Sequence, residues 1–276
     1  MAGKLFVVAT PIGNMGDITL RAIESLRAAD LIAAEDTRRA RALLTHLGIG
    51  SKELARCDEA VRGEALEGIL ARLEGGATVA FVSDAGTPVI ADPGSALVAA
   101  ARARGIAVVG VPGPSALTAL LSVSGLDSRA VRFIGFLPRG DRARAEALAA
   151  MRASTDVTVF FEAPHRMAET LRAVGEALGE RRVVIGRELT KLYEEVIVGA
   201  ASEIAAREEA REWLGEIVVA VDGRGEEESA VVGEAEIDRR IAALRAEGRR
   251  AKEIAELVAL ETGWSKRDVY ARVIAK

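Results

Sequence analysis

A strand followed at once by a tight loop decides the predicted fold: Thr78-Val79-Ala80-Phe81-Val82-Ser83-Asp84-Ala85-Gly86-Thr87-Pro88. The apolar run at its start predicts a buried strand over Thr78–Ser83. The small residues, the glycine and the proline that come next are typical of a turn. A helix is predicted to follow over Ser95–Arg104. A strand, a short loop and a helix in succession form the repeating unit of parallel α/β sheets.

The same unit recurs through the first half of the chain. The predicted strands are Leu5–Thr10, Leu31–Glu35, Thr78–Ser83 and Ala107–Val111. The predicted helices are one capped by Asp17 that runs to about Leu26, an arginine-rich helix after Glu35, Ala60–Leu73 and Ser95–Arg104. Because strands and helices alternate, we expect parallel strands joined by right-handed crossovers.

In the second half the strands follow one another with less helix between them, which predicts a mixed, partly antiparallel sheet. The predicted strands there are Arg132–Leu137, Val157–Glu162, Val183–Gly186, Glu195–Val198 and Glu216–Val221. The predicted helices are Ser115–Val123, Arg142–Arg152 and, approximately, His165–Leu178. We place the boundary between the two halves near residues 112–125.

The last part of the sequence predicts a linker and a helical module. Residues 223–236 have the glycine-rich and charged composition of a linker. Apolar residues at helical spacing then predict three short helices, the third beginning with a capping box at Ser265–Asp268. The module resembles a small helix-turn-helix with Arg249, Arg250, Lys266 and Arg267 exposed. Binding of nucleic acid and a purely structural role both remain open.

Composition limits the classes of function. The 276 residues suit about two domains, and 50% apolar with 28% charged residues is ordinary for a globular protein. A net charge of −4 argues against a protein that coats nucleic acid by charge alone. One cysteine and two histidines exclude an internal disulfide framework and disfavour a metal site, so we predict none. We also expect no signal peptide, no membrane segment and a cytoplasmic location.

Four predicted strand ends carry unusual loops, which are residues 9–17, 35–38, 83–94 and 112–116. Open α/β sheets bind ligands at the carboxyl ends of their strands. Glycine and other small residues there let the backbone approach an adenosine or amino-acid group, although each loop alone is also an ordinary turn. The sequence has neither a dinucleotide fingerprint nor a phosphate loop. The residues alone therefore predict an α/β enzyme with an unusual nucleotide-like site.

These loops and several further motifs resemble those of the tetrapyrrole methylase superfamily, and within it the ribosomal RNA small subunit methyltransferase I group. The matching stretches are Val8–Thr19, Ala34–Arg38, Ser83–Pro88, Pro112–Ala116, Gly135–Pro138, Phe161–Arg166 and Gly186–Lys191. Each stretch is weak alone. Together they cover residues 5 to about 222 in order, which makes the resemblance specific.

The resemblance implies two α/β domains with a cofactor cleft between them, and the residue patterns add the linker and the helical module. We expect bounds of 1–113 and 114–223 for the two domains, 224–235 for the linker and 236–276 for the module. It also implies a homodimer that uses S-adenosylmethionine to methylate the ribose 2′-hydroxyl of a cytidine in the decoding region of 16S ribosomal RNA, within the small ribosomal subunit. Two alternatives stay open: a precorrin or uroporphyrinogen C-methyltransferase, and a non-catalytic RNA-binding ribosome assembly factor.

The same resemblance implies which residues bind the cofactor. Pro11, Ile12 and Gly13 lie where the porphyrin-methylating relatives have a Gly-Pro-Gly loop. The departures from the porphyrin pattern at the first and third loops favour RNA over a tetrapyrrole as the methyl acceptor. The implied cofactor residues are Pro11, Ile12, Gly13, Asp84, Ala85, Gly86, Thr87, Ile90, Ser115, Ala116, Glu162 and Leu189.

A ribose hydroxyl is a weak nucleophile and benefits from a general base. Glu35 ranks first because it aligns with a carboxylate that the porphyrin-methylating relatives use as a base. Asp36 and His165 are further candidates, although His165 also fits a plain helix start. The predicted RNA contacts are Arg38, Arg39, Arg166, Arg187 and Lys191, because cations, and arginine above all, suit phosphate. With only 4% aromatic residues for base stacking, we expect recognition to rest on the shape of an assembled subunit.

Overall fold

The computed structural model describes residues 3–58, 63–225, 234–262 and 264–275. The chain divides into two compact units. Unit 1 comprises Met1–Val123 and Arg187–Glu195, and unit 2 comprises Ser124–Gly186 and Val196–Lys276. The short segment Arg187–Glu195 therefore packs with unit 1, although the chain on both sides of it belongs to unit 2.

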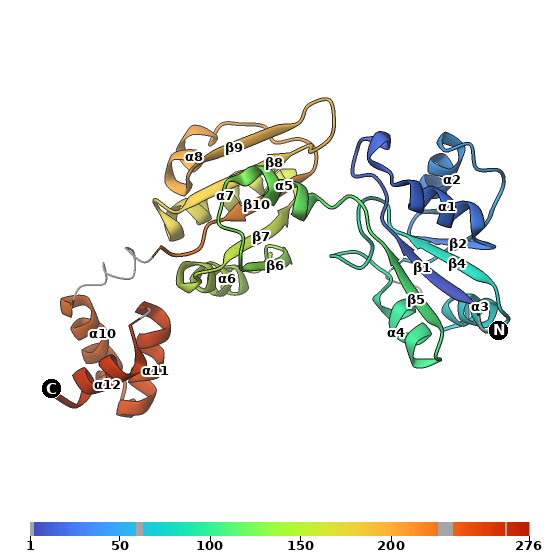
Figure 1. The fold of residues 1–276 in the computed structure, drawn as a ribbon. Coiled ribbons are helices and arrows are strands. Elements are labelled where there is room, and N and C mark those ends of the chain that lie inside the picture. The colour runs from blue at the N-terminus through green and yellow to red at the C-terminus, as the bar shows by residue number, and fades with distance from the viewer. Residues whose placement is uncertain (1–2, 59–62, 226–233, 263, 276) are drawn as a thin grey trace. The chain divides into compact units, whose positions relative to one another are not determined.

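Unit 1 is built on a parallel sheet of five strands in the order β3-β2-β4-β1-β5 (Figure 1). The strands are β1 (Lys4–Val8), β2 (Leu31–Ala34), β3 (Glu53–Arg56), β4 (Thr78–Val82) and β5 (Ala107–Val111). Every neighbouring pair is parallel, with Leu5 of β1 opposite Val79 of β4 on one side and Val108 of β5 on the other. The carboxyl ends of all five strands therefore lie at one edge of the sheet, as the alternating pattern predicted.

Helices cover both faces of this sheet. They are α1 (Leu20–Ala28), α2 (Thr37–His46), α3 (Glu64–Glu74) and α4 (Ser95–Ala103), with a short 3₁₀ helix, η1 (Met15–Asp17), before α1. Helix α5 (Ala116–Ser124) follows β5 in the chain. Buried side chains of α1 and α2 share one core with Ile32 and Ala80, whereas those of α3 and α4 share the other core with Phe81. Two hydrophobic cores thus hold the strand ends at fixed positions.

Two helix starts differ from the sequence prediction. Asp17 does not cap α1; Thr19 does, because its hydroxyl oxygen accepts a hydrogen bond from the amide of Ala22 at 3.1 Å. The helix predicted over Ala60–Leu73 begins at Glu64, after Gly63 at a φ of 61°. Residues 59–62 lie outside the described part of the chain.

Unit 2 contains a second sheet of five strands, in the order β6-β7-β10-β8-β9 (Figure 1). The strands are β6 (Val131–Phe136), β7 (Val157–Glu162), β8 (Arg182–Arg187), β9 (Glu195–Ala200) and β10 (Ile217–Val221), and the helices are α6 (Asp141–Ala153), α7 (Pro164–Leu178) and α8 (Ala201–Arg207). The β6–β7 pair is parallel and the β7–β10 pair antiparallel, which confirms the predicted mixed sheet. One core that includes Phe160 and Met167 joins the sheet to its helices.

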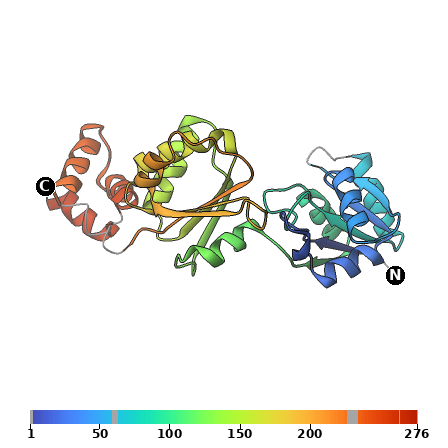
Figure 2. The same ribbon diagram turned by 90° about the horizontal axis from the view of Figure 1, so that it is seen from above.

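The three predicted C-terminal helices are present as α10 (Glu234–Ala246), α11 (Ala251–Thr262) and α12 (Lys266–Ala275) (Figure 2). Their own core contains Ile237, Ile241 and Leu244 of the first helix. The capping box that begins α12 is confirmed, because the amide of Asp268 donates to the Ser265 hydroxyl at 3.1 Å. Most of the predicted linker, residues 226–233, lies outside the described residues. Within the described residues, no helix has the length and apolar character needed to span a bilayer.

Candidate functional site

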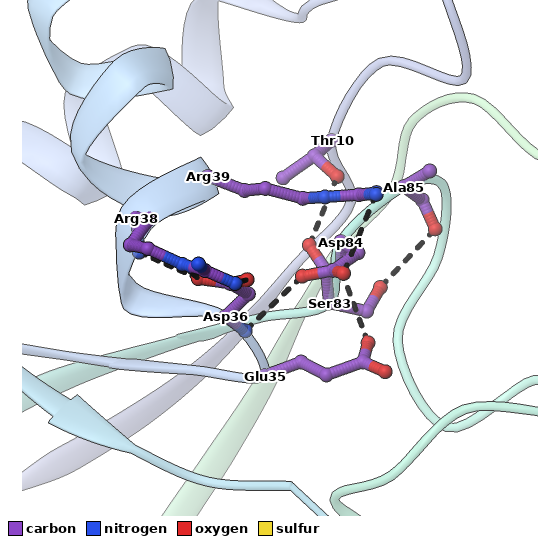
Figure 3. Close-up of polar contacts among 8 residues, drawn as sticks. All are labelled: Thr10, Glu35, Asp36, Arg38, Arg39, Ser83, Asp84 and Ala85. Carbon is purple, nitrogen blue, oxygen red and sulfur yellow. Dashed lines mark hydrogen bonds and ion pairs between the residues drawn. The ribbon is translucent and has the colours of Figure 1, made fainter.

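Backbone hydrogen bonds join the loops that follow β1 and β4 in unit 1. The amide of Thr10 donates to the carbonyl of Gly86 at 2.9 Å, and the amide of Gly86 donates back to the carbonyl of Thr10 at 3.1 Å. Gly86 has a φ of 75°, a conformation that a residue with a Cβ rarely adopts. The Thr10 hydroxyl also faces the Ser83 carbonyl at 3.4 Å (Figure 3). The two loops therefore form one rigid unit at the carboxyl edge of the sheet.

The loop after β5 is joined to the same unit. The Thr87 hydroxyl donates to the Pro114 carbonyl at 3.1 Å. A Cβ on Gly113 would lie 2.9 Å from the Cβ of Ala9, so the two backbones approach as closely as a glycine permits. Ser115 and Ala116 follow at the start of α5 and are half-buried. The first, third and fourth of the predicted loops thus meet, as expected of parallel strand ends.

The second loop contributes two carboxylates, and hydrogen bonds join Glu35 and Asp36 to Asp84 of the third loop. The amide of Asp84 donates to Oε2 of Glu35 at 3.2 Å, and the amide of Asp36 donates to Oδ1 of Asp84 at 3.1 Å (Figure 3). Burial raises the pKa of Glu35 above its usual value; the Asp84 amide opposes this and the Asp84 charge adds to it. Glu35 is therefore a stronger base than an ordinary carboxylate, and it also holds the third loop.

Asp36 has a different environment. Its Oδ1 accepts the amide of Arg38 at 2.8 Å, which caps α2, and its Oδ2 accepts from Nη2 of Arg38 at 2.7 Å. These Arg38 hydrogen bonds hold the pKa of Asp36 well below its usual range. Such a carboxylate is a weak base, so the geometry favours a capping role. The catalytic role of Asp36 stays a prediction.

Asp92 was missed as a site residue by the sequence interpretation, although it lies inside the third loop. Burial raises its pKa to about 6; a hydrogen bond with Ser83 opposes the shift, and the charges of Glu35 and Asp84 add to it. The backbone beside it is strained, with φ of 74° at Val89 and 62° at Ala91. Strain and a perturbed carboxyl in one loop are typical of a functional site. The only signal in the sequence was the sharp Asp92-Pro93-Gly94 turn.

Residues 187–195, which we call the β8–β9 loop, also belong to unit 1. Leu189 is buried, and the stem of Lys191 lies against Gly13, where a Cβ would come within 2.3 Å of the Lys191 Cγ. The Lys191 ammonium pairs with Glu188 at 2.8 Å. Glu188 and Thr190 have positive φ angles of 50° and 67°. Residues other than glycine rarely adopt this conformation, so the packing around the loop must hold its backbone there.

Three predicted residues, Glu162, His165 and Arg166, belong to unit 2 and lie at the end of β7 and the start of α7. Glu162 is fully buried; it pairs with Arg166 at 3.2 Å and accepts from the Thr170 hydroxyl at 2.6 Å. Arg166 also donates to the carbonyls of Leu137 and Pro138. His165 is exposed on the first turn of the helix. Arg166 thus ties the end of β6 to α7, and the predicted cofactor, catalytic and RNA roles of this cluster stay predictions.

The predicted RNA contacts differ in exposure. The side chains of Arg38 and Arg39 are 87% and 64% exposed, while Arg39 pairs with Asp84 at 3.4 Å. Arg187 is largely buried and pairs with Glu195 at 3.1 Å. Among the described residues, no three side chains of histidine, cysteine, aspartate or glutamate are grouped to hold a metal ion.

Comparison with known proteins identifies the class. The family model described as tetrapyrrole (corrin/porphyrin) methylases matches residues 4–205. A diphthine synthase structure shares 16% identity with a TM-score of 0.60, covering 80% of this chain and 90% of that one. Uroporphyrin-III C-methyltransferase from Thermus thermophilus, in complex with S-adenyl homocysteine, shares 16% identity with a TM-score of 0.53, covering 79% and 97%. The protein has the tetrapyrrole methylase fold, which confirms the predicted fold class.

Curated relatives narrow this class. A protein from Mesorhizobium japonicum is 46% identical over 98% of this chain and 91% of its own length, and one from Xylella fastidiosa (strain Temecula1) is 44% identical over 97% and 98%. A third, from Escherichia coli O157:H7, is 43% identical over 89% and 86%. All three are named ribosomal RNA small subunit methyltransferase I. The chain belongs to the ribosomal RNA small subunit methyltransferase I family of tetrapyrrole methylases.

Proposed function

We propose that this protein transfers the methyl group of S-adenosylmethionine to the ribose 2′-hydroxyl of a cytidine in the decoding region of 16S ribosomal RNA. Its family supports the coarser statement: the protein is a methyltransferase with S-adenosylmethionine as donor, acting on ribosomal RNA. The observation that carries the proposal is the set of joined strand-end loops in unit 1, in which Glu35 is held beside the third loop.

The loops suit a donor that is bound mainly through backbone groups. A Cβ would lie 3.2 Å from Cγ2 of Ile12 if placed on Gly86 and 2.9 Å from the Cβ of Ala9 if placed on Gly113, so the backbones of these loops lie close together. The Thr190 hydroxyl supports a ligand there, because it is buried and has no hydrogen-bond partner within the described residues. We therefore propose that backbone groups of residues 11–13 and 85–87, with Ser115, Ala116 and Leu189, hold the donor. When bound, the donor supplies a methyl group activated by its sulfonium.

Glu35 is the proposed general base. In the transfer, the bond between the ribose oxygen and the methyl carbon would form as the methyl–sulfur bond breaks, and the donor would leave as a neutral thioether. Glu35 would take up the hydroxyl proton, a contribution commonly worth about 10²–10⁴-fold in rate. The Asp84 amide fixes Oε2 of Glu35, so the carboxylate does not have to be ordered during the reaction. Burial raises the pKa of Glu35, which strengthens the carboxylate as a base.

Arg38 and Arg39 are the proposed phosphate contacts, because both are exposed at the start of α2 and both are oriented by carboxylates. The four-part domain division, a homodimer, a small-subunit substrate and a cytoplasmic location belong to the same proposal. Two arginines neutralise too few phosphates to bind RNA by charge alone. Recognition of an assembled subunit would supply the remaining contacts, so a short isolated RNA hairpin should be a poor substrate.

The test incubates purified protein with unmodified small ribosomal subunits and S-adenosylmethionine labelled in its methyl group, followed by mapping of 2′-O-methylation. We expect label in one cytidine of 16S ribosomal RNA. An isolated hairpin of the decoding region and a uroporphyrinogen serve as parallel substrates. Label in the tetrapyrrole alone would support the C-methyltransferase alternative. Binding of the subunit without binding of the donor would support a non-catalytic assembly factor.

A further inference from the structure

The tip of the β8–β9 loop exposes two large apolar side chains, although the loop itself packs with unit 1. Leu192 is 87% exposed and Tyr193 is 70% exposed. Of the large apolar side chains that are exposed in the described part of the chain, only Phe136, Tyr193 and Tyr270 are aromatic, and Tyr193 is the most exposed of them. Figure 1 shows the connection between β8 and β9 running beyond the ends of both strands. The loop thus presents an aromatic ring to solvent.

The loop is firmly built. The Arg187 guanidinium donates to the Tyr193 carbonyl at 3.2 Å, and the Thr190 amide donates to the Glu194 carboxylate. Backbone bonds from Lys191 to the Glu188 carbonyl and from Glu194 to the Lys191 carbonyl close two successive turns. Because these contacts fix the backbone on both sides of Tyr193, little backbone entropy remains to be lost when the ring meets a partner.

The loop is also anchored to a donor loop. The stem of Lys191 occupies the space over Gly13, and the Glu188 carboxylate holds the Lys191 ammonium in that position. Tyr193 is only two residues beyond this contact. A group that touches Tyr193 therefore lies near the loop at which the donor is proposed to bind.

The size and polarity of the tip favour a nucleobase as the partner. Two side chains offer far less area than the roughly 800 Å² per partner that a stable protein interface buries. Charged groups surround them, with Lys191, Glu194 and Glu195 nearby in the loop. A single base, by contrast, needs only one ring face, and aromatic stacking is the usual way in which proteins hold an unpaired base.

We propose that Tyr193 stacks on an unpaired base at or next to the methylated nucleotide, and so positions the acceptor ribose. The inference rests on the proposed function, since it presupposes an RNA acceptor. It makes Tyr193 a contact that binds the acceptor without taking part in proton transfer. The rigid Glu188–Lys191 anchor sets the distance between the stacked base and the donor loop.

The experiment compares Tyr193→Ala, Tyr193→Phe and the control Leu20→Ala in methylation of unmodified small subunits under steady-state conditions. Leu20 is 80% exposed in unit 1 and lies outside the loop. We expect Tyr193→Ala to lower kcat/KM for the subunit by about 10- to 100-fold. Tyr193→Phe, which keeps the ring, should stay within about threefold of the unchanged protein, as should Leu20→Ala. Affinity for S-adenosylmethionine, measured by calorimetry without RNA, should not change in any variant.

Three outcomes overturn the inference without touching the proposed function. An active unchanged protein with an unaffected Tyr193→Ala variant would show that the ring does not contact the acceptor. Loss of donor affinity in Tyr193→Ala would assign the ring to the donor site. A change in oligomeric state on sedimentation would show that the tip contacts a second copy of the chain. If the unchanged protein methylates no RNA, the proposed function fails first.

Discussion

Replacing Glu35 with glutamine separates its two roles in the structure. The carboxylate accepts the Asp84 amide at 3.2 Å, and a glutamine oxygen can accept the same hydrogen bond. Glutamine cannot take up the proton of the ribose hydroxyl. Glu35→Gln should therefore keep the donor loop in place and lose only the base. Glu35→Ala removes both functions, because it also leaves the Asp84 amide without this acceptor.

The magnitudes follow from these roles. Loss of a general base should lower the single-turnover rate of Glu35→Gln by about 10²–10⁴-fold. Its affinity for S-adenosylmethionine should remain within about threefold of the unchanged protein, because the hydrogen bond persists. Glu35→Ala should show the same loss of rate and, in addition, a donor affinity weakened by about 2- to 10-fold, the usual range for one lost hydrogen bond.

The assay combines single-turnover methylation of small subunits with calorimetric titration of the donor. The rate of the unchanged protein should rise with pH through a pKa above the ordinary glutamate value, because only the ionised carboxylate accepts a proton. A Glu35→Gln rate within threefold of the unchanged protein would refute Glu35 as the base. Loss of donor affinity in Glu35→Gln would refute the claim that an amide can replace the carboxylate in the loop.

Three further changes test other parts of the site. Asp92→Asn should stabilise the protein by about 1 kcal/mol at pH 7.5, after allowance for partial exposure. Because the folded state favours the protonated carboxyl, the stability of the unchanged protein falls as the pH rises from about 4 to about 6. The gain, measured by urea unfolding, should therefore vanish at pH 4. Gly94→Ala should lower the free energy of unfolding by about 2–4 kcal/mol in the same assay, since Gly94 has a φ of 111° and its Cβ would lie 2.1 Å from Cε1 of Phe81. The control Gly105→Ala, at a φ of 70° and with open space around it, should lower it by only about 1 kcal/mol. Equal losses in the two variants would contradict the steric argument. Thr190→Val should weaken donor binding about 2- to 10-fold without lowering stability, and unchanged affinity on calorimetry would exclude a hydroxyl–donor contact.

Hydrophobic patterning predicted the architecture well where strands are buried on both faces. β4 is almost entirely buried and its apolar run was unmistakable. β3 was missed because it is an edge strand whose ends, Glu53 and Arg56, are charged and exposed. Helix α8 was missed because Ala201–Arg207 makes only about two turns, too few for a periodic signal.

The site was predicted as a set of loops, but its internal contacts were not. The carboxyl ends of parallel strands lie at one edge of a sheet, so the alternation of strands and helices along the chain was enough to predict that the loops after β1, β4 and β5 meet. The hydrogen bonds that join Glu35 and Asp36 to Asp84 depend on a register of two strands that no local pattern encodes. The packing of Arg187–Glu195 with unit 1 is likewise a long-range contact, so the exposure of Tyr193 had no signal in the sequence.

The ion pairs at the start of α2 bear on how an acidic protein holds RNA. Arg38 and Arg39 are the exposed cations of the site, yet Asp36 and Asp84 pair with them and offset much of their charge. Each pair fixes the direction of a guanidinium and weakens its attraction for distant phosphates. Because the overall charge is also negative, long-range steering contributes little, and affinity must come from close contacts. Under the proposed function, two oriented arginines and one stacked aromatic ring would select a correctly folded acceptor rather than gather any RNA. The dependence of subunit binding on salt should accordingly be shallow, with a slope near that of two released counterions.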